Sequence, residues 1–476
     1  MQACSYLVKV YQIIERMQVK FGTDGWRAII AKDFTFDNLK IATLAAADYF
    51  LDHSCRANGV CVGYDTRFMS PEFAEYTAGI LSSRGLRVFL SDSFVPSPAV
   101  SLCCREMQLA GGIMITASHN PPVYNGLKIK ASYGGPAFPE TFALIEKNLA
   151  GINHGNAVTP RKVLIEKTDI KSIYLRHLKK HIDLDAIRKS QITVAHNAMF
   201  GAGQNVISRL FDKSTLTSYH CSLNPGFGGI NPEPVPRYIN DFVGFFKARR
   251  ADAAIITDGD ADRVGMLDEN GSFIDSHKIF AIILKYLAEE KKKSGDVAKT
   301  YALTDIIDRI CRKNKLALHL LPVGFKHVSK LMTTHDILMG GEESGGIGVT
   351  SYLPERDGIY TGLLVLEVMA SKQQSLSGLV KELFSEYGNF YYDRVDLHAG
   401  EKQKQAIIAR SAKGDLRTVG DYRVTGFNDL DGYKYHFEGG WLLIRPSGTE
   451  PVLRLYCEAD SPEKVENALR FAADLA

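Results

Sequence analysis

The sequence lacks paired cysteines, long apolar runs and an excess of charge of one sign. Its eight cysteines include no C-x-x-C pair, which argues against a disulfide framework or a zinc site and indicates reduced thiols. No stretch approaches the roughly 18 apolar residues of a membrane span, so we expect no membrane association. The net charge is only +3, which excludes a broad basic surface for nucleic acid. We therefore expect a cytoplasmic protein that acts on small molecules, including anions bound by a local cluster of Arg and Lys.

The length of 476 residues allows about three domains at roughly 150 residues each. Apolar residues make up 45% and charged residues 23%, as in ordinary soluble globular proteins, and no low-complexity tract separates the domains. We therefore expect the domains to pack closely. The first sixteen residues contain Lys9, Glu15 and Arg16, which do not fit a signal peptide, so we interpret 1–16 as an N-terminal extension. Met17 is a credible alternative start.

Strand-like and helix-like segments alternate along most of the chain, which predicts an α/β architecture. Thr35 and Ser70-Pro71 are expected to open helices, and two more helices are expected after 201–203 and over 280–293. Buried strands are expected at 60–64, 86–90, 111–116, 191–195, 253–257 and 337–341. The C-terminal part predicts an α+β module of about 90 residues. Its expected strands are 391–397, 433–437, 441–444 and 452–458. Its last helix is expected to start at Ser461-Pro462.

A first polar loop, TASHNPP at 116–122, follows one of these strands. A sharp turn can expose the hydroxyl of Ser118 as a nucleophile or phosphate carrier, although Ser118 could equally be an ordinary turn serine. His119 is a candidate catalytic residue, but adjacent side chains rarely face each other, which argues against a Ser–His general-base pair. Lys128, on an expected short strand, could pair with a phosphate or move a proton.

A second loop, DGDADR at 258–263, places three carboxylates at alternate positions after an apolar strand. Clustered like charges are costly without a cation, and hard oxygen ligands suit Mg²⁺ or Ca²⁺. The EF-hand pattern fails because Arg263 stands where that loop needs glycine. Asp258, Asp260 and Asp262 are therefore predicted to bind Mg²⁺ with room for a ligand oxygen, the alternative being a solvated acidic turn.

Two further loops have residues that could bind a ligand. The loop GGEESGG at 340–346 can approach a ligand through its glycines, and Glu342 and Ser344 could bind neighbouring sugar hydroxyls. The loop RPSGTEP at 445–451 can form an anion nest with a bidentate arginine, and Arg454 could join it. A plain glycine-rich connection and a simple β-turn are the alternatives. Lys326, shortly after Gly324, adds one more potential phosphate cation.

These loops make the chain resemble the α-D-phosphohexomutase superfamily over nearly its whole length. The resemblance rests on five motifs in order, which are FGTDGWR at 21–27, TASHNPP at 116–122, DGDADR at 258–263, GEESGG at 341–346 and RPSGTEP at 445–451. It implies four domains around a central cleft, three related mixed-sheet α/β domains and a smaller C-terminal α+β domain. We expect their boundaries at 17–165, 166–272, 273–388 and 389–476.

The resemblance also implies roles for individual residues. Ser118 is the phosphoserine, and one of its phosphate oxygens completes the Mg²⁺ site of Asp258, Asp260 and Asp262. Arg27 and Lys128 assist proton transfer and charge stabilisation near the transferring group. The residues implied to contact substrate are Arg263, Gly324, Lys326, Glu342, Ser344, Arg445, Ser447, Gly448, Thr449 and Arg454.

The implied reaction interconverts hexose 1-phosphate and hexose 6-phosphate. Phosphoserine donates its phosphoryl group to a hexose monophosphate, a hexose 1,6-bisphosphate turns over, and the other phosphate returns to the serine. Transfer then depends on positioning and charge neutralisation. The expected cofactors are one Mg²⁺ per chain and glucose 1,6-bisphosphate as activator, and the expected assembly is a monomer or homodimer.

The sugar loop favours glucose among the hexoses. Glu343 gives the GEES form that resembles phosphoglucomutases, where bifunctional relatives often have Met and phosphoglucosamine mutases often have Gln. Gly346 replaces a His common in those two groups. The alternatives are a phosphomannomutase, a bifunctional phosphomannomutase/phosphoglucomutase and, more remotely, a non-catalytic sugar-phosphate-binding relative. The intact Ser118 and metal aspartates argue against the last of these.

Overall fold

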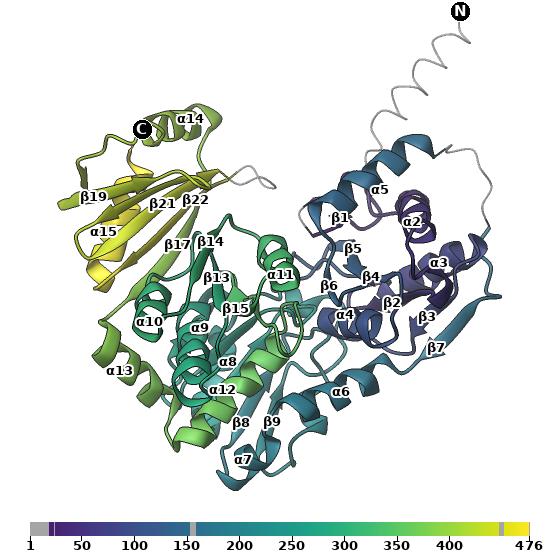
Figure 1. The fold of residues 1–476 in the computed structure, drawn as a ribbon, viewed down its shortest axis with the longest axis horizontal. Coiled ribbons are helices and arrows are strands. Elements are labelled where there is room, and N and C mark those ends of the chain that lie inside the picture. Colours follow the sequence, from purple (N-terminus) through teal and green to yellow (C-terminus); the bar gives the residue numbers. More distant parts are fainter. Residues whose placement is uncertain (1–18, 23, 153–158, 447–451, 476) are drawn as a thin grey trace, which may run out of the picture.

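The computed structural model describes residues 19–22, 24–152, 159–446 and 452–475, which form four sheets with associated helices. In the view of Figure 1 the first sheet lies on the right, the fourth lies at the upper left, and the second and third lie between them. Within the described ranges, no helix combines the length and the apolarity that crossing a bilayer requires. The expected class, three α/β units followed by a smaller α+β unit, is confirmed.

The first sheet is mixed and has the order β1-β5-β4-β2-β3-β7, with β6 beside β5. Its strands are β1 (Trp26–Ile29), β2 (Val60–Tyr64), β3 (Val88–Ser91), β4 (Gly111–Ile115), β5 (Tyr124–Ala131), β6 (Gly135–Pro136) and β7 (Ile165–Thr168). Strand β2 is buried throughout, as its continuous apolar run predicted. Strand β5, which carries Lys128, runs antiparallel to both of its neighbours, β4 and the edge strand β1.

Helices around this sheet begin largely where the sequence predicted. They are α2 (Phe36–Leu51), α3 (Ser70–Ser83), α4 (Ser97–Glu106) and α5 (Pro139–Gly151), followed by α6 (Ile170–His181) and α7 (Leu184–Lys189) on the way to the second sheet. The side chain of Thr35 caps α2 by accepting a hydrogen bond from the backbone N–H of Asn38. Strand β7 lies at the expected first domain boundary and pairs with β3, so it completes the first sheet.

The second sheet has the order β12-β11-β10-β8-β9. Its elements are β8 (Val194–Asn197), β9 (Leu216–Tyr219), α8 (Asn240–Arg249), β10 (Ala253–Thr257), β11 (Val264–Leu267) and β12 (Phe273–Ile274), with 3₁₀ turns η2 (Ile207–Arg209), η3 (Phe227–Gly229) and η4 (Pro236–Tyr238). The helix expected after 201–203 is wrong, because that segment consists of turns. The backbone N–H of Ala202 donates to the carbonyl of Gly259, and a Cβ at Gly201 would lie 2.7 Å from the carbonyl of Asp258. The segment therefore lies flat against the loop after β10.

The third sheet has the order β14-β13-β15-β16. Its elements are α9 (Ser276–Lys285), the π-helical turn η5 (Tyr286–Glu290), β13 (Asp296–Thr300), α10 (Ile306–Asn314), β14 (Leu318–Leu321), α11 (Phe325–Thr334), β15 (Ile337–Gly341), β16 (Ile347–Val349), α12 (Gly358–Lys372) and α13 (Leu376–Tyr387). The helix expected over 280–293 starts earlier, because Asp275 caps it, and its α-helical part ends at Lys285. Strand β15 delivers the glycine-rich loop as predicted.

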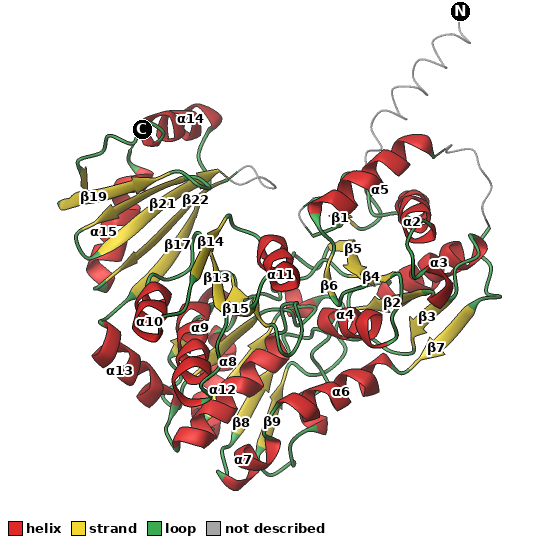
Figure 2. Cartoon of the chain, viewed as in Figure 1, coloured by secondary structure: helices red, strands yellow, loops and turns green. Residues whose placement is uncertain are grey.

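The fourth sheet is antiparallel and has the order β17-β22-β21-β20-β19-β18. Its elements are β17 (Tyr391–Leu397), α14 (Glu401–Ser411), β18 (Thr418–Val419), β19 (Tyr422–Asn428), β20 (Tyr433–Phe437), β21 (Gly440–Pro446), β22 (Leu453–Ala459) and α15 (Pro462–Ala473). Helix α15 packs against β17 and β22 (Figure 2). Ser461 caps this helix, as the sequence predicted.

One buried apolar cluster extends through the first three sheets and their helices, with members such as Cys61, Tyr174, Ile255 and Leu363. The fourth sheet has a cluster of its own. A small cluster that includes Tyr301 and Trp441 joins the third and fourth sheets. The expected close packing of the domains is therefore confirmed.

Candidate active site

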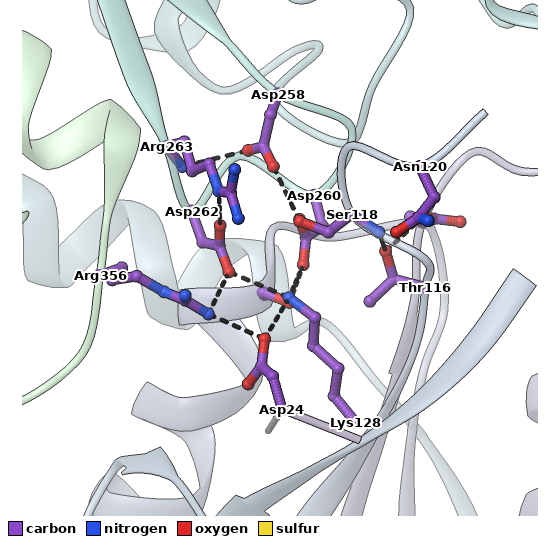
Figure 3. A network of polar contacts seen from close by, with 12 residues as sticks. Asp24, Thr116, Ser118, Asn120, Lys128, Asp258, Asp260, Asp262, Arg263 and Arg356 are labelled. Atoms are coloured by element: carbon purple, nitrogen blue, oxygen red, sulfur yellow. Dashed lines mark hydrogen bonds and ion pairs between the residues drawn. The ribbon is translucent and has the colours of Figure 1, made fainter. Parts of the chain in front are cut away.

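The serine loop follows β4 and turns sharply at Ser118, whose φ of +53° lies in the left-handed region. The hydroxyl of Thr116 accepts a hydrogen bond from the backbone N–H of Ser118 at 2.9 Å. Beneath the loop, the buried guanidinium of Arg67 donates to the carbonyls of Ser118 at 2.6 Å and Asn120 at 2.7 Å. Because these contacts hold the backbone of the turn, the serine hydroxyl is left to face the loop of the second sheet (Figure 3).

The acidic loop follows β10 and meets the serine loop directly. The hydroxyl of Ser118 donates a hydrogen bond to Oδ2 of Asp258 at 2.9 Å. Asp258, Asp260 and Asp262 are buried, and each offers an oxygen within 4.8 Å of the others. The approach depends on Gly259, because a Cβ there would lie 2.4 Å from the carbonyl oxygen of Ser118. The structure thus brings together the predicted phosphate carrier and the predicted metal ligands.

The three aspartates fit a hard divalent cation. Oδ1 of Asp260 and Oδ1 of Asp262 are buried, and neither has a hydrogen-bond partner within the described residues. Burial and the neighbouring carboxylates of Asp260 and Asp262 raise the pKa of Asp258 well above its usual range. Unpaired carboxylate oxygens at this density are costly unless a cation binds them, and Mg²⁺ prefers oxygen ligands of this kind. The donor set therefore fits Mg²⁺.

Lys128 lies among these carboxylates. Its buried ammonium group is 2.8 Å from Oδ2 of Asp260 and 3.0 Å from Oδ2 of Asp262. Although burial lowers the pKa of Lys128, the nearby carboxylates raise it above its usual value, so the ammonium group stays charged. Lys128 in turn holds the pKa of Asp260 below its usual range, against the effect of burial. Lys128 is thus placed to neutralise charge beside Ser118.

Arg27 and His119, the other two predicted catalytic residues, lie in different environments. Nη1 of Arg27 donates to Oδ1 of Asn120 at 2.7 Å, which ties β1 to the serine loop. His119 is half-buried, and burial followed by Arg263 and Arg27 lowers its pKa well below the usual value. The imidazole is therefore neutral at pH 7. The Ser118 hydroxyl donates to Asp258 instead, which agrees with the expectation that Ser118 and His119 form no general-base pair.

Arg263 supports the acidic loop through its backbone. Its N–H donates to Oδ1 of Asp258 at 3.1 Å, and Nη1 of its side chain lies 3.9 Å from Oε1 of Glu233. The next residue, Val264, donates its N–H to the carbonyl of Gly345 in the glycine-rich loop at 3.2 Å. This contact places the predicted sugar loop directly against the predicted metal loop.

Arg356, between β16 and α12, was not predicted from the sequence. Its buried guanidinium lies 3.0 Å from Oε1 of Glu342 and 2.9 Å from Oδ2 of Asp262, so it joins the sugar loop to the metal loop. It also explains Gly346, because a Cβ at that position would lie 2.3 Å from Cδ of Arg356. Ser344 is half-buried in the same loop.

The fourth sheet presents the predicted phosphate arginines side by side. Arg445 on β21 and Arg454 on β22 are directly opposite each other in the register. Nε of Arg445 lies 3.0 Å from Oδ1 of Asp431, and Nε of Arg454 lies 3.7 Å from Oδ1 of Asp396. Like charges directly opposite each other destabilise a sheet, so the pair favours an anionic ligand. Ser447, Gly448 and Thr449 lie outside the described residues.

Gly324 and Lys326 lie at the start of α11. The backbone N–H of Val323, just before them, donates a hydrogen bond at 2.7 Å to Oδ2 of Asp431, the ion-pair partner of Arg445. Gly324 precedes the helix with a φ of +129°, a conformation that favours glycine, and half-buried Lys326 is in its first turn. In the view of Figure 1, α11 lies between the fourth sheet and the first sheet. The phosphate contacts expected of these two residues stay predictions.

Three residues in these networks were missed by the sequence reasoning, namely Arg67, Arg356 and Asp24, which forms an ion pair with Lys128. Asp24 belongs to the FGTDGWR motif, so its motif was the available signal. Arg67 follows an Asp65-Thr66 pair after β2, and Arg356 lies in an ordinary polar turn before a helix cap. Nothing local distinguishes these arginines from surface residues, because their partners lie far away along the chain.

Comparison with known proteins agrees with this geometry. Models for the alpha/beta/alpha domains I, II and III and the C-terminal domain of phosphoglucomutase/phosphomannomutase match residues 18–155, 172–271, 275–387 and 398–475. A phosphoglucomutase/phosphomannomutase of Thermococcus kodakarensis is 30% identical and covers 96% of this chain and 98% of its own. A phosphoglucosamine mutase of Jannaschia sp. is also 30% identical, covering 92% of this chain and 94% of its own.

Comparison with solved structures gives the same family. The crystal structure of a candidate phosphomannomutase from Thermus thermophilus superposes with a TM-score of 0.85 and 34% identity, covering 96% of this chain and 98% of the other. The serine loop, the acidic triad and the four-domain order thus occur together in a chain that matches the family from end to end. This protein belongs to the phosphoglucomutase/phosphomannomutase family of the α-D-phosphohexomutase superfamily and is an enzyme of the phosphohexomutase type.

Proposed function

We propose that this enzyme interconverts α-D-glucose 1-phosphate and glucose 6-phosphate, through a phosphoserine at Ser118 and glucose 1,6-bisphosphate. The observation that carries the proposal is the 2.9 Å hydrogen bond from the Ser118 hydroxyl to Asp258, beside two buried carboxylate oxygens that accept no hydrogen bond within the described residues. A phosphoryl group on Ser118 would enter a site already equipped with a cation-binding triad and with Lys128.

The chain's own residues supply most of what phosphoryl transfer needs, which is positioning and charge neutralisation. Asp258, Asp260 and Asp262 would hold Mg²⁺, which when bound neutralises charge on the transferring phosphoryl group. Arg67 holds the backbone of the serine loop in place, because its guanidinium donates hydrogen bonds to the carbonyls of Ser118, Asn120 and Pro121. Lys128 supplies a fixed positive charge next to the serine.

Two further sites support a reaction in which both phosphates visit both positions. Arg445 and Arg454, paired across two strands, would hold the phosphate that is not reacting. Glu342 and Ser344 would hold sugar hydroxyls, and Arg356 fixes the carboxylate of Glu342 by an ion pair. With the phosphate and the hydroxyls held separately from Ser118, a bisphosphate could be held in either orientation.

The preference for glucose rests on the sugar loop. Glu343 is the residue that distinguishes the GEES form, and burial and Glu342 raise the pKa of its carboxyl. Its Oε2 lies 3.3 Å from the hydroxyl of Thr300, which donates to it. The relatives named for mannose and glucosamine phosphates make those sugars the competing substrates.

The test is a direct mutase assay. The enzyme is supplied with glucose 1-phosphate, Mg²⁺ and a trace of glucose 1,6-bisphosphate, and glucose 6-phosphate is followed over time. Mannose 1-phosphate and glucosamine 1-phosphate are assayed in parallel at equal concentration. We expect the highest kcat/KM for glucose 1-phosphate. Absence of turnover with all three sugars would refute the mutase proposal, and faster turnover of mannose or glucosamine phosphate would refute the choice of glucose.

A further inference from the structure

The FGTDGWR motif contains a buried carboxylate for which the proposed reaction has no use. The side chain of Asp24 is only 17% exposed. Its Oδ2 lies 3.1 Å from the ammonium group of Lys128 and 2.9 Å from Nη2 of Arg356, which are both buried (Figure 3). Nη2 of the more exposed Arg27 lies 3.6 Å from the same oxygen. Asp24 is not among the three residues whose oxygens cluster as a metal site. Its position therefore needs another explanation.

The backbone forces Asp24 against Lys128. Gly25 has a φ of +131°, and a Cβ there would lie 2.2 Å from the carbonyl of Leu127 and 2.9 Å from Cα of Lys128. Only glycine allows the chain to pass so close to β5. The antiparallel register that starts at Trp26 and Leu127 then continues this contact along β1. The sequence Asp-Gly thus places a carboxylate against Lys128, which contacts the metal loop.

Lys128 and Arg356 depend on carboxylates that have a second use. Lys128 contacts Asp24, Asp260 and Asp262. Arg356 shares Asp24 and Asp262 with it and also contacts Glu342, which is a predicted sugar ligand. Asp260 and Asp262 are two of the three proposed metal ligands, so their charge is also needed there. Among the described residues, Asp24 is the one carboxylate that both cations share and that lies outside the triad.

We propose that Asp24 is a positioning residue that holds Lys128 and Arg356 beside the metal loop and so leaves Asp260 and Asp262 free for the cation. Without the negative charge of Asp24, Lys128 would interact more strongly with Asp260 and Asp262, and Arg356 with Asp262, so both cations would compete with metal binding. The inference rests on the proposed function of the acidic triad. It assigns a role to the part of the FGTDGWR motif that precedes Arg27.

The experiment measures metal binding and catalysis separately. Mn²⁺, used as the probe, is titrated calorimetrically into dephosphorylated full-length protein, and kcat and KM are measured with glucose 1-phosphate. Asp24→Asn should weaken Mn²⁺ binding about tenfold and lower kcat more than it raises KM, because a charge that shapes the site is lost. Asp24→Glu keeps the charge and should recover part of both losses.

Asp305 offers a matched control. Its Oδ1 is likewise shared by two largely buried lysines, at 2.9 Å from Lys299 and 3.5 Å from Lys434, but it lies between the third and fourth sheets. Asp305→Asn removes a carboxylate that likewise pairs with two lysines, and it should leave Mn²⁺ affinity unchanged. An equal loss of Mn²⁺ affinity in both variants would overturn the proposal, because the effect would then be general destabilisation.

Other outcomes also decide the question. Unchanged Mn²⁺ affinity in a folded Asp24→Asn protein overturns the proposal. If that variant does not fold, Lys128→Met provides the test, because removing the competing cation should strengthen Mn²⁺ binding, and unchanged or weaker binding overturns the proposal. A wild-type protein that binds Mn²⁺ but turns over no sugar phosphate refutes the mutase function alone, so the two failures are distinguishable.

Discussion

Replacing Gly259 with alanine tests whether the serine loop and the metal loop must touch. The added Cβ would lie 2.4 Å from the carbonyl oxygen of Ser118, whereas ordinary van der Waals contact begins at 3.4 Å. Relief requires the two loops to separate by about 1 Å, because the obstacle is backbone and not a flexible side chain. A misplacement of about 1 Å in an active site can cost roughly 10²-fold in rate. Overpacking of this kind also costs about 1–3 kcal/mol in folding stability.

The assay compares kcat/KM for glucose 1-phosphate in Gly259→Ala and wild type, with thermal unfolding of both proteins. We expect a loss of about 100-fold with a folded protein. Gly244→Ala is the control in the same domain, because Gly244 lies in α8 with open space around its Cβ position. Alanine there should stabilise the helix by about 0.5–1 kcal/mol and leave the rate unchanged. Full activity in Gly259→Ala would refute the claim that contact between the loops sets the geometry of transfer.

Three further predictions concern separate parts of the molecule. Ser118→Ala should prevent phosphorylation of the protein by glucose 1,6-bisphosphate, and intact-protein mass spectrometry would contradict the assignment if phosphate were still incorporated. Arg445→Ala should raise KM at least tenfold and change kcat less, because a phosphate anchor binds substrate and transition state alike. Steady-state kinetics that show a lower kcat with an unchanged KM would rule out an anchor. Burial raises the pKa of Asp357 to about 7, so the folded protein holds a proton that the unfolded chain releases near pH 4, and stability falls as pH rises from 4 to 7. Asp357→Asn should flatten the dependence of melting temperature on pH over that range, and an unchanged slope would contradict this explanation.

Local sequence patterns predicted the elements that deliver the site. The strands at 60–64, 253–257 and 337–341 have the predicted bounds because each is a continuous apolar run that is buried on both faces. The helix caps at Thr35 and Ser461 could also be predicted from the sequence, since a hydroxyl before an apolar helix satisfies an exposed backbone N–H. Motifs of this kind placed Ser118 and the three aspartates correctly on loops after strands.

Long-range contacts decided what the sequence could not predict. The helix expected after 201–203 is absent because that backbone packs on the acidic loop, more than fifty residues later in the chain. Asp24 and Arg356 are 332 residues apart, and no periodicity or local composition links them. Arg67 was missed for the same reason, because the carbonyls that accept its hydrogen bonds come close to it only when the serine turn is folded. The roles of the predicted substrate residues still await the kinetic tests above.

The wide spacing of these ion pairs has a consequence for synthesis of the chain. At about 5–20 residues per second, a ribosome needs roughly 15–70 s to pass from Asp24 to Arg356. Lys130, fully buried on β5, must likewise wait for its carboxylate partner Glu355. A nascent first domain therefore contains a buried ammonium group before its counter-ion exists. A chain terminated early would keep that uncompensated charge, so truncated products should fail to mature and be removed by cellular quality control.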